Sequence, residues 1–178
     1  MTRFALFPTS IGDCGIAWQE DRVTATQLPE RSNQATAARL ARRAGASEGE
    51  PPPVIGTAIE SIKSLLEGSR CDLTFIPCDF STVPAMAARV YEAARKIPAG
   101  ETATYGDIAL DLGDRTLARE VGRILGRNPL PIIVPCHRVI GADGKLTGFS
   151  AYGGVTTKLR MLAIEGVLID RQQDLFEE

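Results

Sequence analysis

Hydrophobic and polar residues follow short strand-like runs in the first part of the chain. These runs make up the opening sequence RFALFPTSIGDCGIAWQEDRVTATQL, in which IGD and QED are the expected hairpin turns. The pattern then predicts a helix over residues 31–45 with Asn33 as its cap, ended by the sequence ASEGEPPP. In the next sequence, IGTAIESIKSLLEG, Ile59, Ile62 and Leu65 recur at the helical period, and a strand is expected in CDLTFIPCDFS.

From Val83 onwards, the spacing of apolar residues is helical. One helix is predicted in VPAMAARVYEAARKIP, whose apolar side carries Met86, Val90, Tyr91 and Ala94. Two short helices follow, YGDIALDLG with Thr104 as its cap and DRTLAREVGRILGRN with Asp114 as its cap. The proline-rich sequence PLPIIVPCHRVIG is expected to be extended but irregular, and a last helix in VTTKLRMLAIEGV ends at Gly166.

These elements predict an α/β (α+β) fold in two parts. We expect residues 1–80 to form a small sheet-and-helix domain and residues 81–170 to form a mainly helical domain with a helix-turn-helix. The boundary is expected near residues 78–84, and residues 171–178 are expected to be a frayed tail.

The composition is that of an ordinary globular protein, with 178 residues, 44% of them hydrophobic and 24% charged. The N-terminal sequence lacks a signal pattern, and no apolar run approaches the ~20 residues of a membrane span. We therefore expect a cytoplasmic protein without a membrane partner, in which thiols stay reduced. The net charge of −2 does not favour a polyanionic partner for the chain as a whole.

The four cysteines form no C-x₂-C pair, and the chain has a single histidine. A structural zinc site or a disulfide framework is therefore not expected. The histidine, His137, directly follows Cys136 between a proline and an arginine. Such a pair can be a nucleophile with its base, two metal ligands, or a buried core cysteine beside a satisfied histidine. Neighbouring side chains point to opposite faces of a strand, so a water would have to bridge the pair there.

The pair of short helices at residues 104–128 has the outline of a helix-turn-helix. Its second helix carries an arginine at every fourth position, namely Arg115, Arg119, Arg123 and Arg127. Small residues recur at the same spacing, namely Ala118, Gly122 and Gly126. Arginines beside a smooth strip suit a phosphate backbone and a narrow groove. The alternative interpretation is a solvated face combined with tight helix packing.

The sequence NPLPIIVPCHRVIG closely resembles the active-site signature of the O6-alkylguanine-DNA alkyltransferases, the methylated-DNA–protein-cysteine methyltransferases. The resemblance continues upstream through IPAGETATYGDIA and the arginine-bearing helix, and downstream through KLRMLAIEG. It covers roughly residues 83–167, with a weaker similarity in TSIGDCGIAW. It implies a ribonuclease-H-like sheet in residues 1–80 and places DNA binding and alkyl acceptance in residues 81–170.

The resemblance implies direct reversal of O6-alkylguanine damage in DNA and leaves activity on O4-alkylthymine open. Cys136 would accept the alkyl group irreversibly, so that each molecule acts once without a cofactor. His137 would deprotonate the thiol through a water, and Glu165 would orient His137. Asn128 would brace the turn that leads to the acceptor.

The resemblance also implies a monomer that binds the minor groove of double-stranded DNA and flips the alkylated guanine out of the stack. Arg119 would fill the gap, and Tyr105 would crowd the phosphate of the flipped nucleotide and protonate the leaving guanine at O6. The full set of DNA-binding residues would be Tyr105, Arg115, Ala118, Arg119, Gly122 and Arg123.

Two details differ from the family's usual pattern. The loop GFSAYGG is longer than usual, so that Phe149 or Tyr152 can be the aromatic wall of the alkyl pocket. We favour Phe149, with Ser150 near the guanine edge and Val139 also in the pocket. The residues that bind zinc in some members are missing, so no metal is expected.

Two other functions compete with alkyl transfer. Alkyltransferase-like proteins bind the lesion but lack the acceptor thiol, and the presence of Cys136 argues against this function. A thiol hydrolase would need an oxyanion site and would leave the arginine-bearing helix unexplained.

Overall fold

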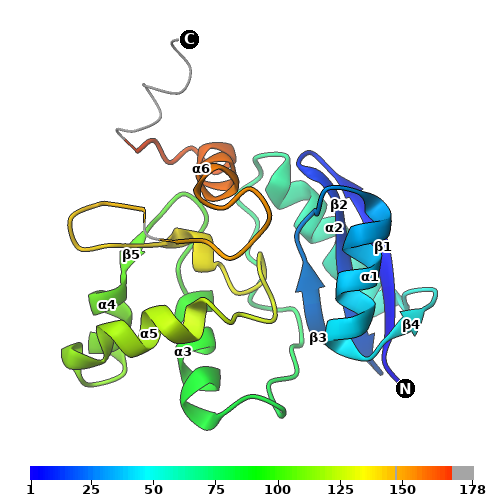
Figure 1. Cartoon of the computed structure of the whole chain (residues 1–178), viewed down its shortest axis with the longest axis horizontal. Coiled ribbons are helices and arrows are strands. Elements are labelled where there is room, and N and C mark those ends of the chain that lie inside the picture. Colours follow the sequence, from blue (N-terminus) through cyan, green and yellow to red (C-terminus); the bar gives the residue numbers. More distant parts are fainter. Residues whose placement is uncertain (147, 170–178) are drawn as a thin grey trace.

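The computed structural model describes residues 1–146 and 148–169 and has an α+β fold, as predicted. A sheet with two helices forms one side of the molecule, and the remaining helices with their loops form the other side (Figure 1). Within the described residues, no helix combines the length and the apolar character needed to cross a membrane.

The sheet is built on two consecutive hairpins. Strands β1 (Arg3–Thr9), β2 (Gly12–Gln19) and β3 (Arg22–Gln27) are antiparallel, and their turns lie at residues 10–11 and 20–21. The two-residue strand β4 (Ser47–Glu48) pairs with β1 in parallel, which gives the order β3-β2-β1-β4. Strand β3 therefore lies at an edge of this sheet.

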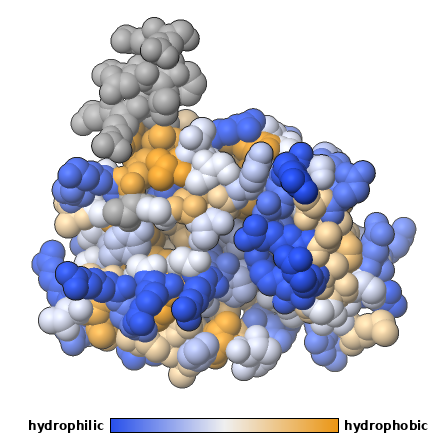
Figure 2. Space-filling model, viewed as in Figure 1, coloured by the Kyte–Doolittle hydropathy of each residue, from blue (hydrophilic) through white to orange (hydrophobic). Residues whose placement is uncertain are grey.

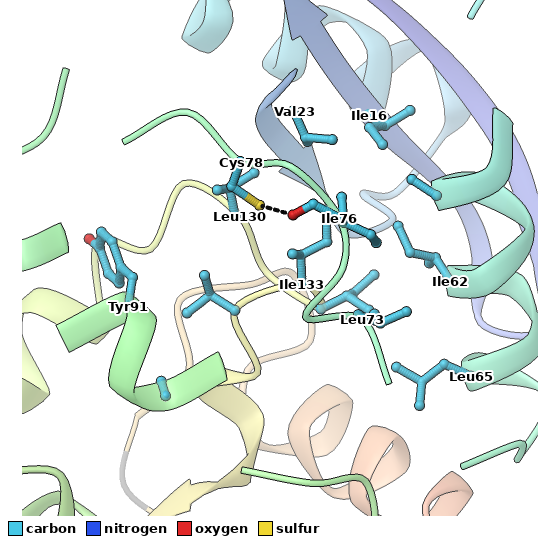
Figure 3. Close-up of a cluster of buried hydrophobic side chains, with 14 of the residues drawn as sticks. Ile16, Val23, Ile62, Leu65, Leu73, Ile76, Cys78, Tyr91, Leu130 and Ile133 are labelled. Atoms are coloured by element: carbon cyan, nitrogen blue, oxygen red, sulfur yellow. Dashed lines mark hydrogen bonds between the residues drawn. The ribbon is translucent and has the colours of Figure 1, made fainter. Parts of the chain in front are cut away.

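Each face of the sheet is covered by one helix. Helix α1 (Asn33–Ala44) places Leu40 against Phe4 and Ala17 on one face. Helix α2 (Pro53–Leu66) packs its apolar side on the other face, against a cluster that includes Ile16. Figure 3 shows that this cluster continues into the second half of the chain, where Leu130 and Ile133 lie close to the same side chains. The hydrophobic core thus joins the sheet to the segment that precedes Cys136.

The second half consists of short helices joined by tight turns. In chain order these are α3 (Ala85–Arg95), α4 (Tyr105–Asp111), the 3₁₀ helix η1 (Arg115–Leu117), α5 (Ala118–Leu125), the 3₁₀ helix η2 (Cys136–Arg138) and α6 (Val155–Ile164). A two-stranded parallel sheet pairs β5 (Ala103–Thr104) with β6 (Val139–Ile140). Both caps expected here are present, because Thr104 accepts from the amide of Asp107 and Asp114 accepts from the amide of Thr116.

Four local predictions were wrong. The cap of α1 is Ser32, which accepts from the amide of Ala35. No strand forms over residues 71–81, where the side chains of Asp72 and Asp79 bond to nearby amides and stabilise turns instead. A 3₁₀ turn precedes α5 in place of one continuous helix, and the segment before Cys136 is a series of turns rather than extended chain. The expected tail, residues 171–178, lies outside the described residues.

Leu40 offers a test of how α1 is attached to the sheet. Its side chain is fully buried between the helix and the sheet. We expect Leu40→Ala to lower the free energy of unfolding by about 2–5 kcal/mol, because the substitution leaves a cavity. Arg42→Ala, at an exposed position of the same helix, should change it by less than about 0.5 kcal/mol. Urea unfolding measures both, and equal effects would show that Leu40 does not anchor α1.

Candidate active site

Cys136 begins a single 3₁₀ turn, directly after Pro135. Three residues complete a turn of this helix, so Cys136 and His137 point in different directions. The side chain of Cys136 is half-buried and lines a cleft, whereas His137 is buried. Burial raises the pKa of the Cys136 thiol, although hydrogen bonding from Asn128 and the charge of Lys158 lower it. The resting group near pH 7 is therefore the thiol rather than the thiolate.

The imidazole of His137 is held by a buried carboxylate. Its Nε2 lies 2.8 Å from Oε1 of Glu165, a residue that follows the end of α6. Burial lowers the pKa of His137, although Glu165 raises it, so the ring is neutral near pH 7. Burial raises the pKa of Glu165, but hydrogen bonds from His137 and Arg138 outweigh it and hold this pKa at about 2.

These charge states determine which ring nitrogen of His137 carries the proton. A carboxylate can only accept hydrogen bonds, so Nε2 must donate to Glu165 and Nδ1 must hold a lone pair. Nδ1 is buried and has no hydrogen-bond partner among the described residues. The arrangement therefore presents a neutral imidazole whose free nitrogen can accept a proton.

Arg138 binds the same carboxylate from the other side. Its Nε donates to Oε2 of Glu165 and its Nη2 donates to Oε1, both at 2.8 Å. Such a bidentate pair is strong and fixes the plane of the carboxylate. The remaining donor, Nη1, bonds to the carbonyl of Ile97 at 2.6 Å. The buried charge of Glu165 is thereby compensated.

The turn that leads from α5 to Cys136 is braced by Asn128. The Nδ2 of Asn128 donates to the carbonyl of Val134 at 2.9 Å, and its Oδ1 accepts from the amide of Leu130 at 2.9 Å. Ile132 lies within this turn at φ +79° and is buried. This left-handed conformation costs a β-branched residue about 1–3 kcal/mol. The surrounding contacts must therefore hold the turn in its shape.

A cleft of about 660 Å³ opens beside Cys136 and lies between the two halves of the chain. Its wall in the second half includes Tyr105, Gly122, Arg127, Asn128, Phe149, Ser150 and Lys158. Its wall in the first half includes Thr24, Gln27, Arg39 and Arg43. Cys136 also lines this cleft, so its side chain can be reached from it.

Lys158 and Arg138 are two residues of this site that the sequence analysis missed. Lys158 is buried, and its Nζ donates to the carbonyl of Val139 at 2.6 Å. Burial lowers the pKa of Lys158, while Cys136 raises it. A signal for Lys158 exists in the sequence, because Lys158 and Glu165 are seven residues apart and share the buried side of α6 with Leu162. Arg138 carries no such signal, since its partner is distant in sequence.

Of the residues expected to line the alkyl pocket, some line the cleft and others do not. Phe149 is half-buried and lines the cleft, and Ser150 lines it while donating to the carbonyl of Gly126 at 2.8 Å. Tyr152 is 56% exposed and does not contribute to the lining. Val139 is fully buried behind the cleft, and only its carbonyl reaches Lys158.

The helix-turn-helix residues lie at the outer end of the cleft. Tyr105 begins α4 and is half-buried, with its ring facing Gly122, where a Cβ would come within 3.6 Å of two ring carbons. Gly122 and the ring of Tyr105 are therefore direct neighbours on the two helices. Ala118 lies one turn before Gly122 on α5 and is half-buried.

The arginines of this region are exposed to solvent. Exposed positions hold Arg115, Arg119, Arg123 and Arg127, and Arg123 forms an ion pair with Glu120 one turn away. Figure 2 shows hydrophilic residues in a row over the position of α5, on the face that Figure 1 presents. This positive surface borders the cleft, because Arg127 also lines it.

Comparisons with known proteins agree with this geometry. Residues 85–167 match the family model of the 6-O-methylguanine DNA methyltransferase, DNA binding domain. The chain is 34% identical over 160 residues to a methylated-DNA–protein-cysteine methyltransferase of Methanothermobacter thermautotrophicus, covering 90% of this chain and 83% of that protein. A protein of the same name from Methanosarcina acetivorans is 52% identical over 77 residues, which cover 43% of this chain and 48% of that protein.

Solved structures show the same similarity in three dimensions. The crystal structure of Mycobacterium tuberculosis O6-methylguanine methyltransferase matches with a TM-score of 0.75 and 31% identity, over 99% of this chain and 100% of that one. The M. tuberculosis protein in complex with DNA also gives 0.75 and 31%, over 92% of each chain. The chain therefore belongs to the methylated-DNA–protein-cysteine methyltransferases, a family of DNA-binding proteins that act in DNA repair.

Proposed function

We propose that the protein repairs O6-alkylguanine in double-stranded DNA by transferring the alkyl group irreversibly to Cys136. The observation that carries this proposal is the thiol at the cleft beside a buried, neutral imidazole with a free nitrogen. DNA as partner is supported by the related M. tuberculosis protein, whose structure is in complex with DNA. A lesion-binding protein without transfer is not favoured, because Cys136 is present and accessible from the cleft.

Transfer begins with removal of the thiol proton. A water molecule passes the proton from Cys136 to Nδ1 of His137, which holds the lone pair. The imidazolium that forms is stabilised by Glu165, whose carboxylate stays ionised because hydrogen bonds from His137 and Arg138 hold its pKa at about 2. The positive charge of Lys158 favours the thiolate. The raised resting pKa of Cys136 makes this proton transfer necessary before attack.

The alkyl group then moves in a single displacement. The sulfur of Cys136 forms a bond to the alkyl carbon while the bond from that carbon to O6 breaks. Guanine leaves with the electron pair, and Tyr105 donates its hydroxyl proton to O6. The phenolate of Tyr105 is reprotonated and the imidazolium of His137 gives up its proton, both through solvent, so that the protons balance. The product is a thioether, which is chemically stable, so each protein molecule acts once.

The lesion must leave the duplex to reach the cleft, because the thiol cannot approach a stacked base. We assign α5 to the minor groove, where Ala118 and Gly122 permit a close approach of the backbone. Arg119 would enter the gap that the flipped nucleotide leaves. Exposed Arg115 and Arg123 would contact phosphates on either side. In the cleft, Phe149 would face the alkyl group and Ser150 the guanine edge.

Intact mass measurement tests the acceptor directly. Incubation with duplex DNA that carries O6-methylguanine should add one methyl group, about 14 Da, to each protein molecule and map it to Cys136. Cys136→Ser should bind the lesion without any mass change. Repair of many DNA equivalents by one protein molecule would contradict irreversible transfer.

Glu165→Gln tests the role of the buried carboxylate. The pKa of His137 should fall further, because the carboxylate that raises it is lost. A weaker base should slow single-turnover transfer by about 10²-fold or more, while DNA affinity changes little. A transfer rate within twofold of the wild-type rate would show that Glu165 only supports the fold.

Acid unfolding gives an independent readout of the same substitution. The folded pKa of Glu165, about 2, lies below its ordinary value of 4.5, so wild-type stability must fall as pH drops through this interval. The Glu165 contribution to this loss should be absent in Glu165→Gln. Unfolding midpoints measured at neutral pH and near pH 3 give the comparison.

Two arginine substitutions separate base flipping from phosphate binding. Arg123→Ala should weaken DNA binding and flatten the dependence of log K on log salt by up to about one unit, as loss of one phosphate contact requires. Arg119→Ala should slow transfer from duplex DNA while leaving the reaction with free O6-benzylguanine, which needs no flipping, near normal. The informative quantity is the ratio of the duplex rate to the free-base rate, and an unchanged ratio in Arg119→Ala would refute its assignment.

A further inference from the structure

The segment just before Cys136 is attached to the edge of the N-terminal sheet. Thr26, near the end of β3, donates its amide to the carbonyl of Pro129 at 3.0 Å. The Oγ1 of Thr26 donates to the carbonyl of Pro131 at 2.6 Å. Thr26 is almost fully buried, so these bonds are shielded from water. A single residue of β3 thus binds two carbonyls of the turn that precedes Cys136, residues 128–135, which we call the site turn.

Arg43 lies in the last turn of α1, lines the cleft, and also forms hydrogen bonds with the site turn. Its Nη2 donates to the carbonyl of Thr26 at 2.6 Å and to the carbonyl of Pro129 at 2.9 Å. Its Nη1 donates to Oε1 of the buried Gln27 at 3.1 Å. One guanidinium therefore links α1, β3 and the site turn. Figure 1 shows β3 on the side of the sheet that faces the second half of the chain.

The turn needs such external support for two reasons. Ile132 directly follows Pro131 and adopts a left-handed conformation that β-branched residues avoid. Strained residues of this kind persist only where the surrounding structure over-determines them. Asn128 directly precedes Pro129, and its Nδ2 donates to the carbonyl of Val134, which also accepts from the amide of Cys136 at 2.8 Å. A shift of the Pro129 carbonyl would therefore move Asn128 relative to the thiol.

We propose that Arg43 and Thr26 are positioning residues for alkyl transfer, which hold residues 128–131 so that the turn braced by Asn128 keeps Cys136 in place. The proposal rests on the proposed role of Cys136 as alkyl acceptor. It makes the N-terminal half a part of the reactive site, although none of its side chains touches the reacting atoms. An ordinary contact between the two halves would contribute stability alone.

Two near-isosteric substitutions remove the side-chain donors. Arg43→Met removes the guanidinium, and Thr26→Val removes the hydroxyl while keeping the branched shape and the backbone bond. Arg43→Lys and Thr26→Ser retain a donor at each position. Arg42→Met is the matched control, because Arg42 is the exposed neighbour on α1 and loses the same charge. All variants are compared at a temperature at which circular dichroism shows them to be folded.

Two reactions of the full chain are followed as a function of pH. Single-turnover transfer from free O6-benzylguanine reports on the repair reaction without DNA binding. Alkylation of Cys136 by iodoacetamide, located by peptide mass spectrometry, reports on the thiol alone. We expect Arg43→Met and Thr26→Val to slow transfer roughly tenfold or more, as loss of positioning predicts. The midpoint of both pH profiles should move to higher pH, because displacement of Asn128 weakens an interaction that lowers the pKa of Cys136.

The conservative variants should recover most of the rate and pH midpoint, and Arg42→Met should match the wild type. Unchanged rates and pH midpoints in folded Arg43→Met and Thr26→Val would overturn the proposal, even if both variants were less stable. If Arg43→Met or Thr26→Val failed to fold, Arg43→Lys or Thr26→Ser would replace it in the test. Each of these retains a donor that holds the turn less well, so the pH midpoint should still move upward, by a smaller amount. If the wild type transferred neither the benzyl group of the free base nor the methyl group of duplex O6-methylguanine, the proposed function would be refuted, while the iodoacetamide profiles would still test the positioning.

Discussion

The carboxylate of Glu165 lies buried between His137 and Arg138, and the reactive centre depends on its charge. An isolated carboxylate would become protonated in such a place. Hydrogen bonds from His137 and Arg138 keep it ionised, so it can only accept a hydrogen bond from Nε2. This leaves Nδ1 of His137 with its lone pair and Cys136 with a nearby base. Removal of either partner of Glu165 would disturb the protonation of the whole group.

The position of the thiol depends on a second set of interactions, which come from the other half of the chain. Hydrophobic packing brings Leu130 and Ile133 into the core beneath the sheet (Figure 3). Hydrogen bonds from β3 and α1 then hold the carbonyls of the site turn. Packing alone is not directional, whereas these hydrogen bonds are. Together they can maintain a strained turn next to a reactive side chain.

The cleft and the arginines divide recognition into two kinds of contact. Exposed arginines on and around α5 supply charge that is independent of sequence, which suits a protein that must search long DNA for rare lesions. The cleft beside Cys136 has Phe149 and Ser150 at its wall, so that it offers an apolar and a polar contact to the flipped base of the proposed function. Arg123 forms an ion pair with Glu120, and a phosphate contact of the kind proposed for Arg123 would contribute less to binding if this pair had to open first.

Local patterns in the sequence were sufficient for the features that depend on local physics. The sequence predicted the hairpins and the helix caps Thr104 and Asp114, and it singled out the Cys136–His137 pair. Turns, caps and adjacent residues each involve few positions, so a local pattern is enough to find them. The sequence CDLTFIPCDFS forms only an isolated bridge from Cys78 to Val23 of β3, because the side chains of Asp72 and Asp79 bond to nearby amides and turn the chain on either side of it. Arg138 with Glu165 and Arg43 with Pro129 join residues far apart in the chain. Only the tertiary structure decides such pairs, since a single sequence carries no information on which distant donor meets which buried acceptor.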